Sequence, residues 1–261
     1  DNTGFIWVAT EGGLARFDGN RFRIFDGRTS PLFSDPILRK VFVTPDDRLF
    51  VGTSNHLLKI KDGQIEEVLL DGKSLGAIND IIWFNGYLYA AGEGLFRVSA
   101  NGDHVNRIAG EAGHIRTLAT DQHRLWIGSS TGLSYLDGQH ISQSVPASGL
   151  PSGAHIIHLA QYREQLLVGT SEGLFIASDS GKLRAYETTS GVINDPIEML
   201  FADSKGNLWI GGKQRLLQLT GHTLVEEVNE IKGRTSPWFV SAFEDRAGNL
   251  WFGSRTHGLQ R

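Results

Sequence analysis

A short motif that returns at nearly constant intervals constrains this chain more than any other feature of its sequence. The segments GNLWIGG at 206–212 and GNLWFGS at 248–254 are almost identical, and related segments occur throughout the 261 residues. Successive anchor positions of this motif are separated by 43, 39, 37, 41, 42 and 42 residues, which is too regular to arise by chance. The seven anchors are Trp7, Phe50, Tyr89, Trp126, Leu167, Trp209 and Trp251.

Each repeat contains four segments of strand length. The anchor segment is followed by a second one with a leucine in a constant place, then by an alternating segment such as RFRIF at 21–25, then by an apolar segment such as INDIIWF at 78–84. All four are rich in β-branched and aromatic residues. Pairs such as Asp18-Gly19 and Asn85-Gly86 separate them and are typical of two-residue hairpins. No window shows a sustained helical period, so we expect almost no helix.

Four antiparallel strands in each unit of ~40 residues predict an all-β chain, a seven-bladed β-propeller of four-stranded blades. We expect residues 1–261 to form one propeller domain, in which the anchor side chains pack between neighbouring blades. The first repeat starts at its anchor segment and the last stops inside its second segment, so the first and last blades are predicted to be incomplete. The chain begins at Asp1 without a methionine, and we expect it to be a fragment of a longer protein.

Composition excludes several classes of function. The net charge of −4 is mild and no long basic run occurs, which gives no electrostatic case for a nucleic-acid partner. The chain has no cysteine, so disulfides, thiolate catalysis and cysteine-bound metals are excluded. No stretch reaches the ~18 apolar residues of a membrane span, and we expect no membrane insertion by this fragment. Nothing in the sequence predicts a cofactor or a metal ion.

The repeat resembles a known family. The segments DNTGFIWVATEGGLARFDG at 1–19, DSKGNLWIGGKQRLLQL at 203–219 and EDRAGNLWFGSRTHGLQR at 244–261 follow the pattern of the two-component regulator propeller repeats. The resemblance covers the whole chain, but it is weaker in the second, third and fifth repeats, which lack the acidic residue and glycine before the anchor. In that family such propellers are periplasmic sensor regions of membrane-spanning hybrid histidine kinases or diguanylate cyclases. The resemblance therefore implies a periplasmic sensor domain that is not itself an enzyme.

A specific site is expected where the repeats differ. Aligning the apolar segments that precede each anchor isolates two variable residues in each blade, and in a propeller these segments line the central channel. The pairs mix both charges with amides and hydroxyls, which would suit a small polar ligand or a saccharide. A channel wall that is simply hydrated is the alternative interpretation. The predicted channel residues are Arg39, Asp80, Arg116, His158 and Glu198, from a set that also contains Lys40 and Asn79.

The loops that enter these segments supply the other candidate ligand-binding residues, Arg28, His114, His155, Arg234 and Trp238. Trp238 beside charged residues suits a sugar or a peptide, although it could equally cap the core. The segments RTSP at 28–31 and at 234–237 are identical, so their arginines could clamp an anion, or they could be surface loops with a common ancestor. The pair His155 and His158 is not expected to share a metal, because residues three apart on a strand point to opposite faces.

Three functions remain open. The first is a ligand-sensing domain of a transmembrane receptor, which binds a small molecule or saccharide and acts within a homodimer of the parent receptor. The second is a propeller for protein–protein interaction. The third is a propeller lyase, for which no catalytic residue can be named, since the known nucleophile and metalloprotease motifs are absent.

Overall fold

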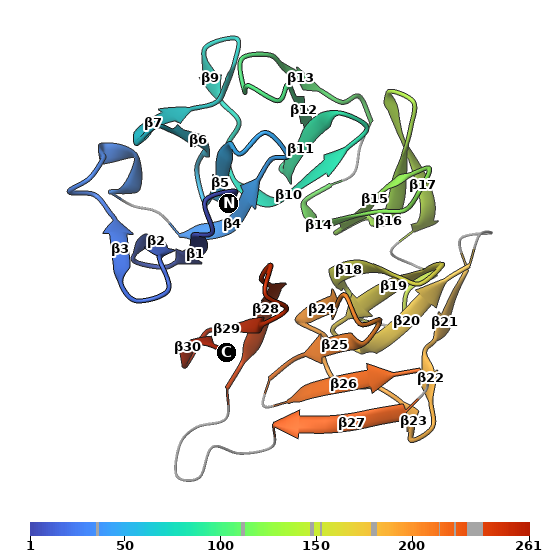
Figure 1. The fold of residues 1–261 in the computed structure, drawn as a ribbon. Coiled ribbons are helices and arrows are strands. Elements are labelled where there is room, and N and C mark those ends of the chain that lie inside the picture. The colour runs from blue at the N-terminus through green and yellow to red at the C-terminus, as the bar shows by residue number, and fades with distance from the viewer. Residues whose placement is uncertain are drawn as a thin grey trace. The chain divides into compact units, whose positions relative to one another are not determined.

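Seven antiparallel sheets follow one another along the chain, one for each sequence repeat (Figure 1). The computed structural model describes residues 1–34, 37–110, 113–146, 149–151, 153–178, 182–213, 215–221, 223–228 and 237–261. We call the sheets blades 1 to 7 in chain order. The architecture is all-β, and the described part of the chain contains one helix, the three-residue 3-10 turn η1 (Pro31–Phe33). The fold class is that of the predicted seven-bladed propeller.

The strands run in sequence order within every blade, as antiparallel meanders do. Blade 1 contains β1 (Ile6–Thr10), β2 (Gly13–Phe17) and β3 (Phe22–Phe25); blade 2 contains β4 (Leu38–Val43), β5 (Leu49–Thr53), β6 (Leu57–Lys61) and β7 (Gln64–Glu67). Blade 3 contains β10 (Ile78–Phe84), β11 (Tyr87–Gly92), β12 (Leu95–Val98) and β13 (Val105–Arg107); blade 4 contains β14 (Ile115–Thr120), β15 (Leu125–Ser129), β16 (Gly132–Asp137) and β17 (His140–Pro146).

The remaining blades repeat the pattern. Blade 5 contains β18 (Ile156–Tyr162), β19 (Gln165–Thr170), β20 (Gly173–Ala177) and β21 (Leu183–Ala185); blade 6 contains β24 (Met199–Ala202), β25 (Leu208–Gly211), β26 (Leu216–Thr220) and β27 (Thr223–Val228). Blade 7 contains β28 (Phe239–Glu244), β29 (Leu250–Ser254) and β30 (Gly258–Gln260). Blades 1 and 7 have three strands each and are therefore incomplete, as predicted; the second segment of the last repeat forms β30. Two small hairpins that the repeat did not predict are β8 (Leu69–Leu70) with β9 (Lys73–Ser74) and β22 (Glu187–Thr188) with β23 (Gly191–Val192).

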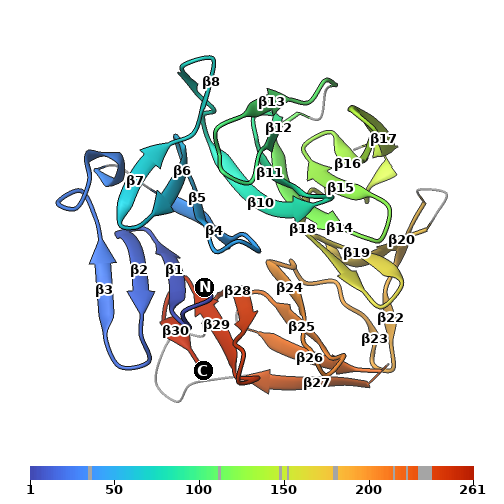
Figure 2. The ribbon, with the colours of Figure 1, turned by 45° about the horizontal axis from the view of Figure 1, so that its top comes forward.

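Packing divides the chain into two units, residues 1–116 with 138–141 and residues 117–137 with 142–261. In the first unit, β4 lies beside β1 on one side and β10 on the other (Figure 2). In the second, β18 lies beside β15 and β24, and β24 lies beside β28. We call β4, β10, β14, β18, β24 and β28 the inner strands. Buried apolar clusters lie between successive blades, for example around Leu167 and Leu217 between blades 5 and 6.

The glycine of the anchor motif allows this close packing of blades. A Cβ atom at Gly52 would lie 2.8 Å from Cγ2 of Ile78, and one at Gly169 would lie 2.7 Å from Cγ2 of Ile197. In both cases the isoleucine belongs to the segment that begins the next blade's inner strand. A larger residue at either position would therefore push neighbouring blades apart. Five of the seven repeats carry glycine two residues after the anchor, and the first and third carry Ala9 and Ala91 there.

A carboxylate holds the indole of every tryptophan anchor. The Nε1–H group of Trp209 donates to Oδ2 of Asp203 over 2.9 Å, and that of Trp251 donates to Oδ2 of Asp245 over 2.8 Å. The same contact joins Trp7 to Asp1 over 2.7 Å and Trp126 to Asp121 over 2.6 Å. A buried indole needs such an acceptor, because an unpaired N–H group inside the protein is destabilising.

The hydrogen bond from the indole helps to lower the pKa of these aspartates. Hydrogen bonds from Trp251 and then Asn249 lower the pKa of Asp245 to about 2. Burial acts to raise the pKa of Asp203, but hydrogen bonds from Asn207 and Trp209 outweigh it, and the pKa is lowered. Both carboxylates are therefore charged acceptors at neutral pH.

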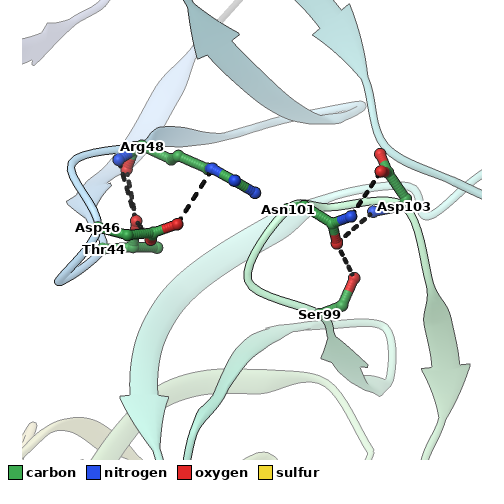
Figure 3. A network of polar contacts seen from close by, with 6 residues as sticks. All are labelled: Thr44, Asp46, Arg48, Ser99, Asn101 and Asp103. Atoms are coloured by element: carbon green, nitrogen blue, oxygen red, sulfur yellow. Dashed lines mark hydrogen bonds and ion pairs between the residues drawn. The ribbon is translucent and has the colours of Figure 1, made fainter.

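Blade 2 shows what replaces the aspartate where the anchor has no N–H group. Its anchor, Phe50, is fully buried, and Thr44 stands six residues before it, where Asp203 stands before Trp209. The hydroxyl of Thr44 donates to Asp46 over 2.7 Å and accepts from the amide of Arg48 over 3.0 Å, which closes the same turn (Figure 3). The third and fifth anchors, Tyr89 and Leu167, also follow turns without the aspartate. The three repeats in which the family pattern is weaker are thus the three without a tryptophan anchor.

Candidate functional site

The variable pair coincides with a β-bulge on four of the inner strands, those of blades 2, 3, 5 and 7. The register of β4 against β5 shifts between Leu38 and Lys40, and that of β10 against β11 shifts between Ile78 and Asp80. Equivalent shifts occur in blades 5 and 7, between Ile156 and His158 and between Phe239 and Ser241. A bulge inserts a residue that the ladder does not pair, so its side chain can vary without loss of a cross-strand partner. This geometry explains why the sequence differs there.

In the first unit the bulged residues form a polar network across three blades. A guanidinium nitrogen of Arg39 donates to the side-chain oxygen of Asn79. Nδ2 of Asn79 lies 2.6 Å from the carbonyl oxygen of Ile115 and 3.1 Å from Nε2 of His114. Nδ1 of His114 lies 3.0 Å from Oε1 of Glu93. The tautomer with its proton on Nδ1 satisfies both contacts of the ring, because Asn79 then donates to Nε2.

An ion pair lies alongside this network. Nζ of Lys40 lies 2.7 Å from Oδ1 of Asp80, whose side chain is only 9% exposed, so the aspartate neutralises a neighbouring cation. Arg116, at the end of the first unit, is exposed and makes no ion pair with any described residue. We call Arg39, Lys40, Asn79, Asp80, Glu93, His114 and Arg116 the inner-strand polar cluster. Its cations exceed its carboxylates, and its guanidinium and amide groups offer hydrogen bonds to a polar ligand.

The second unit contributes fewer polar groups at these positions. The hydroxyl of Thr117 accepts from the amide of Leu159 over 3.1 Å, so this side chain joins two inner strands. His158 and Glu198 are half-buried, and the register of β18 places His158 opposite Gly169. The bulge between Ile156 and His158 disturbs the simple alternation of faces that we assumed for the histidine pair. His155 is exposed and lies just before β18, and its amide donates to the Ser171 hydroxyl over 3.2 Å.

In blades 2, 5 and 7 the residue before the inner strand occupies the same place, which we call the entry position. Its carbonyl oxygen accepts from the residue after the anchor strand: Ile37 from Ser54 over 3.0 Å, His155 from Ser171 over 3.1 Å, and Trp238 from Arg255 over 3.0 Å. His114 precedes β14 in the same way. Three of the loop residues predicted from sequence therefore share one structural position in their blades.

Trp238 lies beside two cations. Cζ of Arg255 is 4.7 Å from the centre of its ring and Nζ of Lys213 is 5.6 Å from it. The side chain is partly exposed, so it does not simply cap the core, which was the alternative interpretation.

The clamp formed by two arginines stays a prediction, because only Arg28 belongs to the described residues. Arg28 is 89% exposed and forms an ion pair with Asp26 in its own loop, over 2.6 Å. This contact raises the pKa of Arg28 and lowers that of Asp26. A shallow depression of about 390 Å³ lies beside these residues and is lined also by Glu11 and Phe33. Arg234 lies outside the described residues.

One cluster has the composition of a catalytic triad without its geometry. Oγ of Ser74 lies 3.4 Å from Nδ1 of His56, and Oε1 of Glu67 lies 2.7 Å from the same nitrogen. A triad needs the two partners on different ring nitrogens, because one nitrogen takes the proton of the nucleophile while the carboxylate accepts a hydrogen bond from the N–H group of the other. Ser74 instead donates to the carbonyl oxygen of Asn55 over 2.9 Å, which is a structural contact.

No group of three or more metal-binding side chains comes together within the residues that the structure describes. The same residues contain no helix with the length and hydropathy that a membrane span requires.

Sequence reasoning did not find Glu93, Lys213 and Arg255. All three lie in the loop that follows an anchor strand, the loop that meets the entry position. The alignment that compared inner segments could have been extended to these loops, where charged residues interrupt the otherwise small and polar sequence.

The chain has the fold of several solved structures. It matches the extracellular domains of two proteins of B. thetaiotaomicron assigned as hybrid two component systems, BT4673 and BT3049, with TM-scores of 0.79 and 0.80 and sequence identities of 17% and 18%. Both matches cover 99% of this chain, which spans 36% and 38% of the length of those chains. A catalytically inactive virginiamycin B lyase from Staphylococcus aureus, solved with quinupristin, matches with a TM-score of 0.78 and 14% identity over 99% of this chain and 91% of the lyase.

No protein-family model matches the sequence, and no curated protein matches it. The matches to the two extracellular domains nevertheless agree with the resemblance drawn from the repeat motif. The fold of this chain is that of the extracellular domains of hybrid two-component systems.

Proposed function

We propose that this chain is the extracytoplasmic ligand-sensing domain of a bacterial transmembrane signalling receptor, a histidine kinase or a diguanylate cyclase. The observation that carries the proposal is the match to extracellular domains of two hybrid two-component systems over 99% of the chain. The motif that returns in the seven repeats supports it independently, because the motif is a property of the amino-acid sequence and does not depend on the fold match.

In this proposal the ligand is a small molecule or saccharide held by the inner-strand polar cluster. Arg39 and Arg116 are its main donors, since neither guanidinium is neutralised by a carboxylate of the described residues. Asn79 orients Arg39, and Glu93 orients His114, so that part of the cluster is organised before a ligand arrives. The proposed domain is the whole of residues 1–261, as part of a longer periplasmic region of an inner-membrane receptor.

The proposed signal is a shift in population between two receptor states. A ligand that contacts several inner strands favours the arrangement in which those strands are close, and a homodimer of the receptor transmits the difference to its output domain. Such a ligand moves the equilibrium only by the difference between its affinities for the two states.

A thermal-shift screen of mono- and oligosaccharides tests the binding function. A saturable rise in melting temperature is expected with one class of saccharide, because a ligand of the folded state stabilises it by mass action. The rise should disappear in Arg39→Ala and Arg116→Ala but persist in Arg21→Ala, which removes an exposed arginine from a turn of blade 1. Signalling by the full receptor that is unchanged in Arg39→Ala and Arg116→Ala would refute the role of this cluster. If no saccharide stabilises the chain, a protein–protein interaction function is favoured instead.

A lyase is the second candidate, and the contact between His114 and Glu93 is the observation that favours it. A histidine oriented by a carboxylate is suited to act as a general base. The fold match to virginiamycin B lyase adds to this argument. Nε2 of His114 is occupied by the amide of Asn79, however, and this favours a binding role over proton transfer. Turnover of a bound ligand that is lost in His114→Ala while binding persists would establish the lyase.

A further inference from the structure

Trp238 is held in place by the backbones of two blades. Its amide donates to the hydroxyl of Thr256 over 3.4 Å, and its carbonyl oxygen accepts from Arg255 over 3.0 Å, both in blade 7. A β-bridge joins it to Lys213, and the amide of the next residue, Phe239, donates to the carbonyl oxygen of Gly212 over 3.2 Å, both in the loop after β25 of blade 6. The indole is therefore presented at a fixed point where the two blades meet.

The charges around this indole are not balanced. Arg255 and Lys213 each place a cationic group over its ring, at 4.7 Å and 5.6 Å from the centre. Neither side chain makes an ion pair with a carboxylate in the described part of the chain. By contrast, the neighbouring Arg215 forms an ion pair with Asp195. Two like charges beside one ring repel each other unless an anion lies between or beside them.

The indole N–H group is also unsatisfied. Nε1 of Trp238 is buried and has no hydrogen-bond acceptor among the described residues. The four anchor tryptophans all have an aspartate for this purpose, so the absence of an acceptor at Trp238 is exceptional within the same fold. A buried donor without an acceptor is destabilising.

We propose that Trp238, Lys213 and Arg255 form a binding site for an oxyanion, the carboxylate or sulfate group of a ligand. One such group supplies what all three lack, namely negative charge for the two cations and an acceptor for the indole N–H group. The cationic side chains are long and flexible, so both can turn toward a bound oxyanion.

This inference deepens the proposed sensing function, because it names the charge of the ligand at the predicted rim residue Trp238. It predicts that an acidic saccharide binds better than its neutral counterpart. The test compares glucuronate with glucose, which lacks the carboxylate, and includes inorganic sulfate at constant ionic strength. Binding is followed through the indole ¹H–¹⁵N resonance of Trp238, assigned by its loss in Trp238→Phe.

The expected result is a saturable downfield shift of this resonance with glucuronate or sulfate, and none with glucose. If only one of the two oxyanions shifts the resonance, it identifies the group that the site takes. The double variant Lys213→Ala/Arg255→Ala should weaken that binding at least about tenfold, which is the scale of one charge-assisted contact. The matched control Arg184→Ala/Lys205→Ala removes the same charge from exposed positions of the same unit and should leave the affinity within about twofold. If the first variant does not fold, Lys213→Gln/Arg255→Gln replaces it.

Stability gives a readout that needs no ligand. Trp238→Phe removes the unsatisfied donor and keeps an aromatic ring, so the melting temperature of the free protein should not fall, whereas glucuronate and sulfate should no longer raise it. A lower melting temperature in Trp238→Phe contradicts the inference. So does an indole resonance of Trp238 that neither glucuronate nor sulfate shifts. An equal loss of affinity in the two double variants also contradicts it. A neutral saccharide that stabilises the chain when neither oxyanion binds overturns this inference alone. Oxyanion binding without any response of the full receptor overturns the sensing function alone.

Discussion

Replacing Asp203 by alanine tests the account of the anchor motif most directly. Its carboxylate accepts from the amides of Lys205 and Asn207, over 3.0 and 2.8 Å, from Nδ2 of Asn207 over 2.9 Å, and from Nε1 of Trp209 over 2.9 Å. The first three donors lie in a turn that water can reach, so water replaces most of the hydrogen bonds that they lose. Trp209 is only 8% exposed, and its stranded N–H group is expected to cost about 1–3 kcal/mol. With the loss of the turn, Asp203→Ala should lower the free energy of unfolding by about 2–4 kcal/mol.

Urea unfolding followed by tryptophan fluorescence and circular dichroism measures this change. In the background of Trp209→Phe, which has no indole donor, Asp203→Ala should cost about 1–2 kcal/mol less than it does in the wild type. Asp18→Ala is the control for a turn aspartate that holds only backbone amides, those of Asn20 and Arg21, and its effect should be smaller. An equal loss of stability in the two backgrounds would refute the role assigned to the carboxylate.

Three other predictions concern the stability of the chain. Because the pKa of Asp245 is lowered to about 2 in the folded protein, its contribution to stability is fully present above the unfolded value near 3.9 and is lost as the pH falls toward 2; the urea midpoint should fall over this range, and less steeply in Asp245→Asn. Gly92→Ala should destabilise or unfold the chain, since its Cβ atom would lie 1.7 Å from the carbonyl oxygen of Ala77, whereas Gly63→Ala, in an open turn, should cost only about 1 kcal/mol for its positive φ in the same assay. Tyr162→Phe should cost about 1 kcal/mol, because its hydroxyl donates over 3.0 Å to a carbonyl oxygen in a turn of the next blade; a melting temperature equal to the wild type's would contradict this.

The number of blades and the place of nearly every strand could be predicted because one pattern recurs seven times. A segment with a weak pattern can be assigned by comparison with the same segment of the other repeats. The anchor strand that contains Leu167 was predicted in this way. The hairpins β8–β9 and β22–β23 occur only once each, so no comparison between repeats could reveal them. The last repeat stops inside its second segment, and Gly258, Leu259 and Gln260 of that segment pair with the anchor strand.

The candidate site was predictable in position but not in its contacts. Alignment of the repeats located Arg39, Asp80 and Arg116 on inner strands, since residues that differ among copies are free from the shared packing. It could not show that Asn79 bridges Arg39 to His114, because such contacts depend on the spacing between blades and on side-chain rotamers. Nor could it show that two cations lie beside Trp238, since Lys213 and Arg255 are distant from it in sequence.

The pairing of each anchor indole with its aspartate restricts how such repeats can diverge. A repeat that exchanges its tryptophan for leucine leaves the aspartate with one hydrogen-bond donor fewer. A repeat that first loses its aspartate leaves the indole N–H group without an acceptor. Either intermediate is less stable than the starting sequence or the final one, so the two positions should be inherited as a unit. Threonine in the turn of blade 2 offers a route between these states, because its hydroxyl closes the turn without a charge. The aspartate and tryptophan of the motif would then be retained in the blades that have not changed and be absent from the blades in which both residues have been replaced.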